Sequence, residues 1–170
     1  LGESNRMYRS LFAVGAALAV VSSVVSQELP QAWADQLQWR SIGPATMGGR
    51  IIGLAVYEKQ PSTWWAATAS GGLLKTTNNG MTFGHQFDRG KVVSIGAVAV
   101  SQSDQNIVWV GTGENKPRNS VSYGNGAYKS TDGGKTWKLM GLEGTFQTGR
   151  IAIHPTNPDI VYVGALGRLY

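Results

Sequence analysis

The side chains best suited to hold a polar ligand are concentrated between Thr112 and Asn125. This stretch combines a carboxylate, two bases, several amides and one aromatic ring. Such a mixture can hydrogen-bond sugar hydroxyls or peptide groups while the ring stacks on an apolar surface. We therefore predict ligand contacts from Glu114, Asn115, Lys116, Arg118, Asn119 and Tyr123. The competing interpretation is an ordinary solvated loop with a salt bridge between Glu114 and Arg118.

The residue types give little support for a catalytic or metal site. The chain has no cysteine, which excludes a disulfide framework, a thiolate nucleophile and a cysteine-based zinc site. Its two histidines, His85 and His154, form no pair with metal-ligand spacing, so we expect neither a metal site nor a cofactor. Asp132 could serve as a catalytic acid or a metal ligand, but its place in a turn motif favours a structural role.

The composition predicts a folded, β-rich protein. Of the 170 residues, 42% are hydrophobic and 15% are charged, which argues against disorder. The 23 glycines and six tryptophans favour short strands joined by tight turns over long helices. The net charge is +5 for the whole chain and +4 without residues 1–26, because the remaining chain has 13 bases, scattered from Arg40 to Arg168, and 9 acids. No nucleic-acid partner is therefore expected.

The N-terminal residues predict export. A short basic start at Met7–Arg9 precedes an apolar run of about 15 residues, and Val24–Ser26 offers the small residues that signal peptidase accepts. We expect residues 1–26 to comprise a few upstream residues and a cleavable signal peptide, followed by a polar lead-in over 27–38. An uncleaved membrane anchor is disfavoured because a spanning helix needs about 18 apolar residues. The predicted location is secreted, periplasmic or in the cell envelope.

The rest of the chain repeats itself. Three alternating apolar runs are each followed, nine residues after the last apolar residue, by an aromatic residue and two positions later by a small one: Val56, Trp65 and Ala67; Val100, Trp109 and Gly111; Ile153, Tyr162 and Gly164. A fixed internal period takes precedence over any element-by-element interpretation. Each unit predicts an antiparallel hairpin.

Further strands complete each predicted unit. A third strand is expected at 73–75 and 127–129, and a fourth opens at Phe83 or Trp137. Four strands per unit predict an all-β fold, a β-propeller of four-stranded antiparallel blades. The predicted propeller spans 39–170, with blade 1 at about 51–88, blade 2 at about 94–140 and the start of blade 3 at about 148–170. We expect a fragment that ends inside its third blade.

A turn motif joins the third and fourth strands. Residues 130–137 read S-x-D-x-G-x-T-W, and 76–83 form a weaker copy. The Asp or Asn can accept hydrogen bonds from the following amides, the Gly can supply positive φ and the aromatic ring can pack into the blade. The residues predicted to hold these turns are Ser130, Asp132, Gly134, Thr136, Trp137, Thr76, Asn78, Gly80, Thr82 and Phe83.

At these residues the sequence resembles the Asp-box (BNR repeat) propellers, which include sialidases, xyloglucanase-type glycoside hydrolases and sortilin-like receptors. The resemblance covers about 39–170 and is closest to secreted bacterial sortilin-like, BNR-repeat proteins, through the segments 39–50, 67–72, 111–115 and 122–124. It implies the fold strongly and the chemistry weakly, because these relatives include enzymes, receptors and proteins of unknown role.

The resemblance also suggests where catalytic residues would lie. Xyloglucanase-type enzymes carry a T-D-x-G-G pattern whose Asp resembles a catalytic carboxylate, and the matching stretch 68–72 has Ala69 at that position. Alanine can neither protonate a leaving group nor attack. Sialidases instead use three arginines and a Tyr nucleophile; Arg50 and Arg118 are available, but nothing fixes a triad. A binding or scaffold role is therefore favoured, with a glycoside hydrolase completed by later blades as the alternative.

Strand alternation defines a predicted binding face. The loops between second and third strands and the connections between blades lie at one end of the sheets. The loop from Gly111 to Gly126 spans fifteen positions, against five from Ala67 to Gly72, so ten residues are inserted on this face. Further contacts are predicted from Arg50, Asp88 and Arg89. The expected partners are a glycan or an extracellular or envelope protein, together with the remaining blades, and no membrane span after signal cleavage.

Overall fold

The computed structural model describes residues 32–33, 49–116 and 121–168. The chain divides into two units, Leu1–Gly43 and Pro44–Tyr170, and every strand belongs to the second. The predicted signal peptide and almost all of the lead-in lie outside the described residues, as do Arg118 and Asn119. Among the residues that are described, none forms a helix long and apolar enough to cross a membrane.

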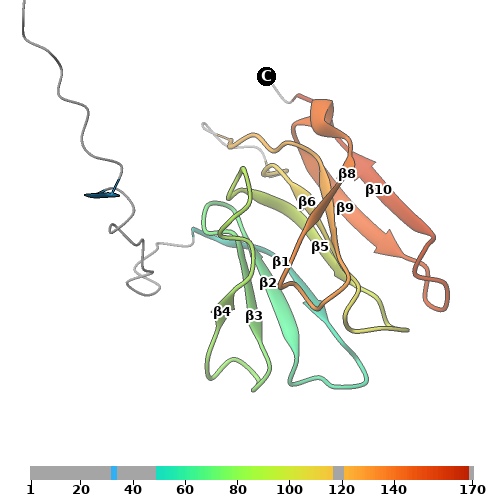
Figure 1. Cartoon of the computed structure of the whole chain (residues 1–170). Coiled ribbons are helices and arrows are strands. Elements are labelled where there is room, and N and C mark those ends of the chain that lie inside the picture. The colour runs from blue at the N-terminus through green and yellow to red at the C-terminus, as the bar shows by residue number, and fades with distance from the viewer. Residues whose placement is uncertain (1–31, 34–48, 117–120, 169–170) are drawn as a thin grey trace, which may run out of the picture. The chain divides into compact units, whose positions relative to one another are not determined.

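Three antiparallel sheets follow one another along the second unit (Figure 1). Two have four strands in the order of the sequence, and the third has two. The elements are β1 (Ile51–Val56), β2 (Trp64–Thr68), β3 (Leu73–Thr76), β4 (Gly84–His85), β5 (Ile95–Val100), β6 (Val108–Thr112), β7 (Ala127–Ser130), β8 (Lys138–Gly141), the 3-10 turn η1 (Glu143–Thr145), β9 (Thr148–Ile153) and β10 (Val161–Ala165). The prediction of an all-β chain with four-stranded antiparallel blades is confirmed.

The sequence repeat corresponds to a repeated strand register. The first two strands of each sheet pair at their turn end through equivalent residues: Val56 with Trp64, Val100 with Val108, and Ile153 with Val161. The register also shifts at the equivalent place in all three hairpins, near the other end of the first strand. The recurring offsets in the sequence therefore reflect one hairpin geometry used three times.

The fourth strands are shorter than the sequence suggests. β4 has two residues and β8 has four, and both begin one residue after the aromatic that was expected to open them. The two aromatic rings pack instead. Phe83 meets Trp64 edge to face at 5.2 Å between ring centroids, and Trp137 meets Phe87 at 5.3 Å.

A hydrophobic core lies between the first and second sheets. Trp65, Leu73 and Ile95 are fully buried there, with Phe87 almost so. Close approach between the second and third sheets depends on glycine, because a Cβ on Gly111 would lie 2.3 Å from the Thr148 side chain. Burial of apolar surface between neighbouring blades is therefore what joins these sheets.

Two equivalent lysines connect successive sheets near their outer parts. Lys75 of β3 lies 4.8 Å from the Trp65 ring centroid and donates a 2.9 Å hydrogen bond to the Gly133 carbonyl of the second sheet's turn. Burial lowers the pKa of Lys75, and Lys135 lowers it further, while Asp132 acts in the opposite direction. Lys129 of β7 pairs with Asp159 at 3.6 Å, so each lysine reaches the following sheet.

Candidate functional site

The long loop after β6 closes like the short loop after β2. In the short loop, the backbone amide and hydroxyl of Thr68 donate to the Gly72 carbonyl at 3.1 and 2.9 Å. In the long loop, the same groups of Thr112 donate to Gly126 at 3.0 and 2.7 Å. The ten extra residues of the long loop therefore fall between two residues that are hydrogen-bonded in the same way as the ends of the short loop. We call residues 112–125 the insertion loop; Figure 1 shows its described residues, 112–116 and 121–125, at the opposite end of the sheets from the β1–β2 turn.

Glu114 is the buried charge of the insertion loop. Its side chain has no exposed surface, and Oε1 accepts a hydrogen bond from Nη2 of Arg50, which directly precedes β1. Arg50 also donates to the Lys116 carbonyl at 3.1 Å. These bonds tie the first sheet to the loop of the second. Because a buried carboxylate needs a charged or hydrogen-bonding partner, Glu114 holds the loop in place.

This burial bears on both sequence-based interpretations of Glu114. The Glu114 carboxylate is enclosed and paired with Arg50, so it does not occupy the solvated position that the alternative interpretation expects. Ligand contact by Glu114 stays a prediction, made for a side chain that has no exposed surface in this structure. Arg118, its expected partner in the solvated loop, lies outside the described residues. Charge patterns along the sequence could not reveal this partnership, because Arg50 is 64 residues away.

Asn115 extends the insertion loop to the third sheet. Its Nδ2 donates a 2.9 Å hydrogen bond to the Gly149 carbonyl in β9, and its buried Oδ1 has no hydrogen-bond partner. Asn115 and Arg150 also line a hollow of about 450 Å³ that runs along β1, β5 and β9. The start of the insertion loop therefore contacts both neighbouring sheets: Arg50, just before β1 of the first, and Gly149, in β9 of the third. Lys116, the next residue, is exposed.

The end of the insertion loop packs on the connection to the third sheet. The Tyr123 ring is 42% exposed and meets Phe146 edge to face, with 5.5 Å between centroids. The Arg168 guanidinium lies 5.8 Å from the Tyr123 ring centroid. A side chain at Gly113 would be impossible, since its Cβ would lie 1.8 Å from the Phe146 carbonyl oxygen. Tyr123 is therefore held in position while part of its ring faces solvent.

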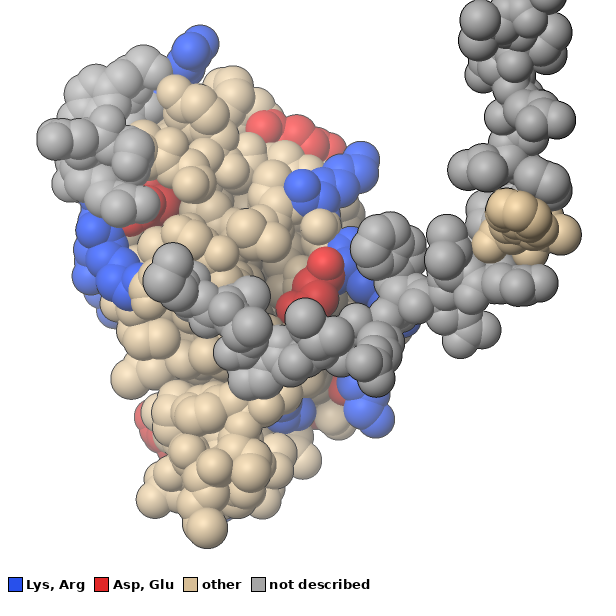
Figure 2. Space-filling view, turned by 90° about the vertical axis from the view of Figure 1, so that its left-hand side faces the viewer, with Lys and Arg blue, Asp and Glu red and all other residues tan. Residues whose placement is uncertain are grey.

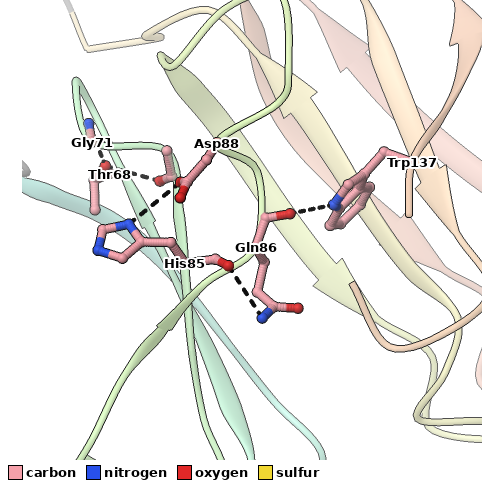
Figure 3. Close-up of polar contacts among 7 residues, drawn as sticks. Thr68, Gly71, His85, Gln86, Asp88 and Trp137 are labelled. Atoms are coloured by element: carbon pink, nitrogen blue, oxygen red, sulfur yellow. Dashed lines mark hydrogen bonds and ion pairs between the residues drawn. The ribbon is translucent and has the colours of Figure 1, made fainter. Parts of the chain in front are cut away.

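Asp88 and Arg89 belong to a different place. They line a hollow of about 620 Å³ between the first and second sheets, which is separate from the hollow at Asn115. Asp88 lies 3.5 Å from Nδ1 of His85, as Figure 3 shows. The structure thus brings Arg50, Glu114, Asn115 and Lys116 together and leaves Asp88 and Arg89 apart from them.

Gln147 was missed by the sequence analysis. Its side chain has no exposed surface, and neither its amide nitrogen nor its amide oxygen has a hydrogen-bond partner. Gln147 directly precedes β9, as Arg50 directly precedes β1. The Gln147 carbonyl accepts a 2.9 Å hydrogen bond from the Leu166 amide, just after β10, and the Arg50 carbonyl accepts a 3.1 Å bond from the Ala69 amide, just after β2. Extending the repeat one residue before each first strand would have indicated both positions.

Asp132 holds the turn between β7 and β8. Its Oδ1 accepts hydrogen bonds from the Ser130 hydroxyl at 2.8 Å and from the Lys135 and Thr136 amides at 2.9 Å, and Oδ2 accepts one from the Thr136 hydroxyl at 2.6 Å. The hydroxyl and amide of Thr136, followed by Ser130, hold the pKa of Asp132 far below its ordinary value. The neighbouring Gly134 has φ of 99°, which favours glycine.

The weaker copy of the turn uses an amide for the same purpose. Asn78 Oδ1 accepts from the Thr76 hydroxyl and the Thr82 amide, both at 2.9 Å, and Gly80 has φ of 88°. The aromatic ends differ, because the Trp137 indole donates a 2.6 Å hydrogen bond to the Gln86 carbonyl of the first sheet (Figure 3). Phe83 has no such donor.

We expect replacement of Asp132 to change how stability depends on pH. The carboxyl has a lower pKa in the folded state than in the unfolded state, where it is about 3.9. Ionised Asp132 therefore stabilises the fold at pH values above about 3.9, and this stabilisation is lost as the pH falls through the folded-state pKa. Asp132→Asn should lower the melting temperature at pH 7, on the order of 5 °C, and the deficit should shrink towards pH 2. Differential scanning calorimetry across pH 2–7 measures this. A deficit that stays constant with pH would contradict an ionised turn acceptor.

In the described part of the chain, no three His, Cys, Asp or Glu side chains form a group that could hold a metal ion. On the face shown in Figure 2, lysine and arginine side chains occur in separate clusters with acidic residues between them. In the described residues, the exposed and partly exposed groups of the candidate site are cations, an amide and one ring.

Comparison with known proteins defines the class of fold. No protein-family model matches the chain, and no curated protein matches it. An ancestral GH74 enzyme has a similar structure, with a TM-score of 0.56, 17% identity, 70% of this chain covered and 17% of that chain. YCF48 from Cyanidioschyzon merolae has a TM-score of 0.50 and 22% identity, over 69% of this chain and 35% of that one. Both are β-propeller proteins, and the chain has the propeller fold.

A GH74 enzyme from Niastella koreensis has 28% identity and a TM-score of 0.45, over 59% of this chain and 15% of that one. The chain thus spans about a third or less of the length of these proteins. Fold likeness at this identity does not transfer an activity.

Proposed function

We propose that the chain supplies blades of an exported Asp-box propeller that binds a glycan or an extracellular or envelope protein through the insertion loop. One observation carries the proposal. The loop is ten residues longer than its equivalent in the first sheet, although its ends form the same threonine hydrogen bonds, and its residues Asn115 and Lys116 bond to Gly149 of the third sheet and to Arg50 of the first. Extra length confined to one loop of a repeated scaffold is typical of a recognition element.

The exposed groups around the loop suit a polar ligand that bears negative charge. Arg50 is 41% exposed, Lys116 is exposed, and Tyr123 presents part of its ring. Glu114 and Asn115 position these groups by bonding to Arg50 and to Gly149. Cations with an adjacent ring can bind carboxylate or hydroxyl groups while stacking on an apolar surface.

A glycan array and a pull-down from cell-envelope extract, both with the full-length protein, test this function. A ligand should bind, and Tyr123→Ala should weaken it by about five- to 150-fold, as loss of a central aromatic contact does. Lys59→Ala, an exposed substitution in the β1–β2 turn at the other end of the sheets, is the matched control. Failure of every glycan and envelope protein to bind would contradict the proposal.

A glycoside hydrolase is the second candidate, supported by the likeness to an ancestral GH74 enzyme. Ala69 occupies the position expected for a carboxylate and is 1% exposed, so the acid and the base or nucleophile would have to come from other blades. Release of reducing sugars from xyloglucan and of sialic acid from sialosides tests this candidate. Paired acidic residues on binding-face loops of later blades would support it.

Export leads to a separate prediction. Expressed with its native N-terminus in a bacterium with a Sec pathway, the protein should be processed after Ser26 and begin at Gln27. N-terminal sequencing or intact mass of the exported fraction measures the start. Retention of Met7 in a membrane fraction would contradict cleavage.

A further inference from the structure

The outer edge of the second sheet has the features of a docking strand. In the described part of the chain, β8 pairs with β7 on one side and with no strand on the other. It has four residues, whereas β4, the equivalent edge of the first sheet, has two. An unpaired strand edge presents backbone donors and acceptors that an extended chain can bind.

The two faces of β8 border different hollows. Leu139 lines the hollow of about 620 Å³, while Lys138 and Met140 line a smaller one of about 160 Å³; Trp137, just before β8, borders both. This alternation follows from the strand geometry, in which successive side chains point to opposite faces. Side chains of a strand added to this edge would alternate between the same two hollows.

The larger hollow has an apolar floor of aromatic rings. Phe87 and Tyr128 lie there edge to face at 5.1 Å, and Phe87 also meets Trp137. The Gln86 carbonyl accepts the Trp137 indole, and Gln86 Nε2 donates to the His85 carbonyl at 3.4 Å (Figure 3). Gln86 Oε1 is a buried acceptor without a hydrogen-bond partner, but the three packed rings make the floor suitable for an apolar side chain.

Positive charge surrounds both hollows. The exposed cations are Arg89, Lys91 and Lys135 at the larger hollow and Lys138 at the smaller one. Of the carboxylates nearby, Asp159 pairs with Lys129 and Asp132 bonds within its own turn, while Asp88 is exposed and lies 3.5 Å from His85. An acidic ligand therefore complements this edge.

We propose that β8 is the docking edge for an extended acidic peptide. The peptide adds as a fifth strand to the second sheet, with apolar side chains in the larger hollow and carboxylates on the Lys138 side. This site lies outside the insertion loop and does not depend on the function proposed for it.

The probe is a capped, fluorescein-labelled octapeptide of alternating leucine and aspartate, titrated into the full-length protein by fluorescence anisotropy at low salt. It should bind, and a leucine–lysine octapeptide should not. The double substitution Lys135→Glu and Lys138→Glu should raise Kd at least about tenfold, and Lys59→Glu, on an exposed turn, should leave it unchanged. Rising salt should weaken binding.

Backbone methylation separates strand addition from simple charge attraction. Alternate N–H groups of an added strand face its partner, so N-methylation of one alternate set should abolish binding while methylation of the other preserves it. Equal loss from both sets, equal binding of the two octapeptides, or a Kd unaffected by the double substitution would overturn the proposal. A hexuronate oligosaccharide is the comparison ligand. If it binds, the double substitution weakens its binding and the peptide does not bind, the proposal is also overturned, because the edge would then be a glycan site.

Discussion

Replacing Arg50 with alanine should lower the free energy of unfolding by about 2–3 kcal/mol. Loss of one partner from a buried ion pair costs roughly 3–5 kcal/mol because the remaining charge stays desolvated. Glu114 has no exposed surface, but Arg50 is 41% exposed, and solvent screening on that side reduces the expected loss. Urea denaturation of the full-length protein, followed by tryptophan fluorescence, measures the change.

A second substitution identifies the buried charge as the cause. In the Arg50→Ala background, Glu114→Gln should restore part of the lost stability, because a neutral amide is easier to bury than an unbalanced carboxylate. In the wild-type background, the same substitution should destabilise. Arg150→Ala, at an exposed position of β9, should change stability by less than about 0.5 kcal/mol. Equal stability of wild type and Arg50→Ala would contradict the structural role of the pair.

Local patterns in the sequence were sufficient to predict the sheets. The offsets from Val56 to Trp65 and from Val100 to Trp109 arise because each hairpin has the same length and register. The S-x-D-x-G-x-T-W motif similarly predicts its own hydrogen bonds, since Asp132 bonds only within its turn. Such features depend on residues close in sequence, whose geometry is set by the local backbone.

The site could be predicted only in part, because its contacts join different sheets. Glu114 and Arg50 come from separate repeats, and their pairing depends on how two blades pack. Burial also changes what a side chain can do: Glu114 reads as a ligand contact in the sequence but is enclosed in the structure. The position of Gln147 follows from extending the repeat one residue before β9, but the burial of its amide depends on how the sheets pack. Packing between repeats is not encoded in the periodicity of one repeat.

The insertion loop can be removed without changing the strands that hold it. Its excision between Thr112 and Asn125, with Thr68 to Gly71 grafted in, would join β6 to β7 as β2 joins β3. The two loops close through equivalent threonine bonds, and loop length alone alters closure free energy only slightly. The graft also removes Glu114, so Arg50 would lose a partner without leaving a buried carboxylate behind. Folding should therefore survive with a modest loss of stability.

Binding by this graft tests the central claim most directly. The full-length wild type and graft would be compared on the glycan array and in the envelope pull-down, with circular dichroism to verify folding. A folded graft that has lost binding by at least about 100-fold, beyond the effect of any single contact residue, is the predicted result. A folded graft that binds with wild-type affinity would exclude the insertion loop from ligand recognition.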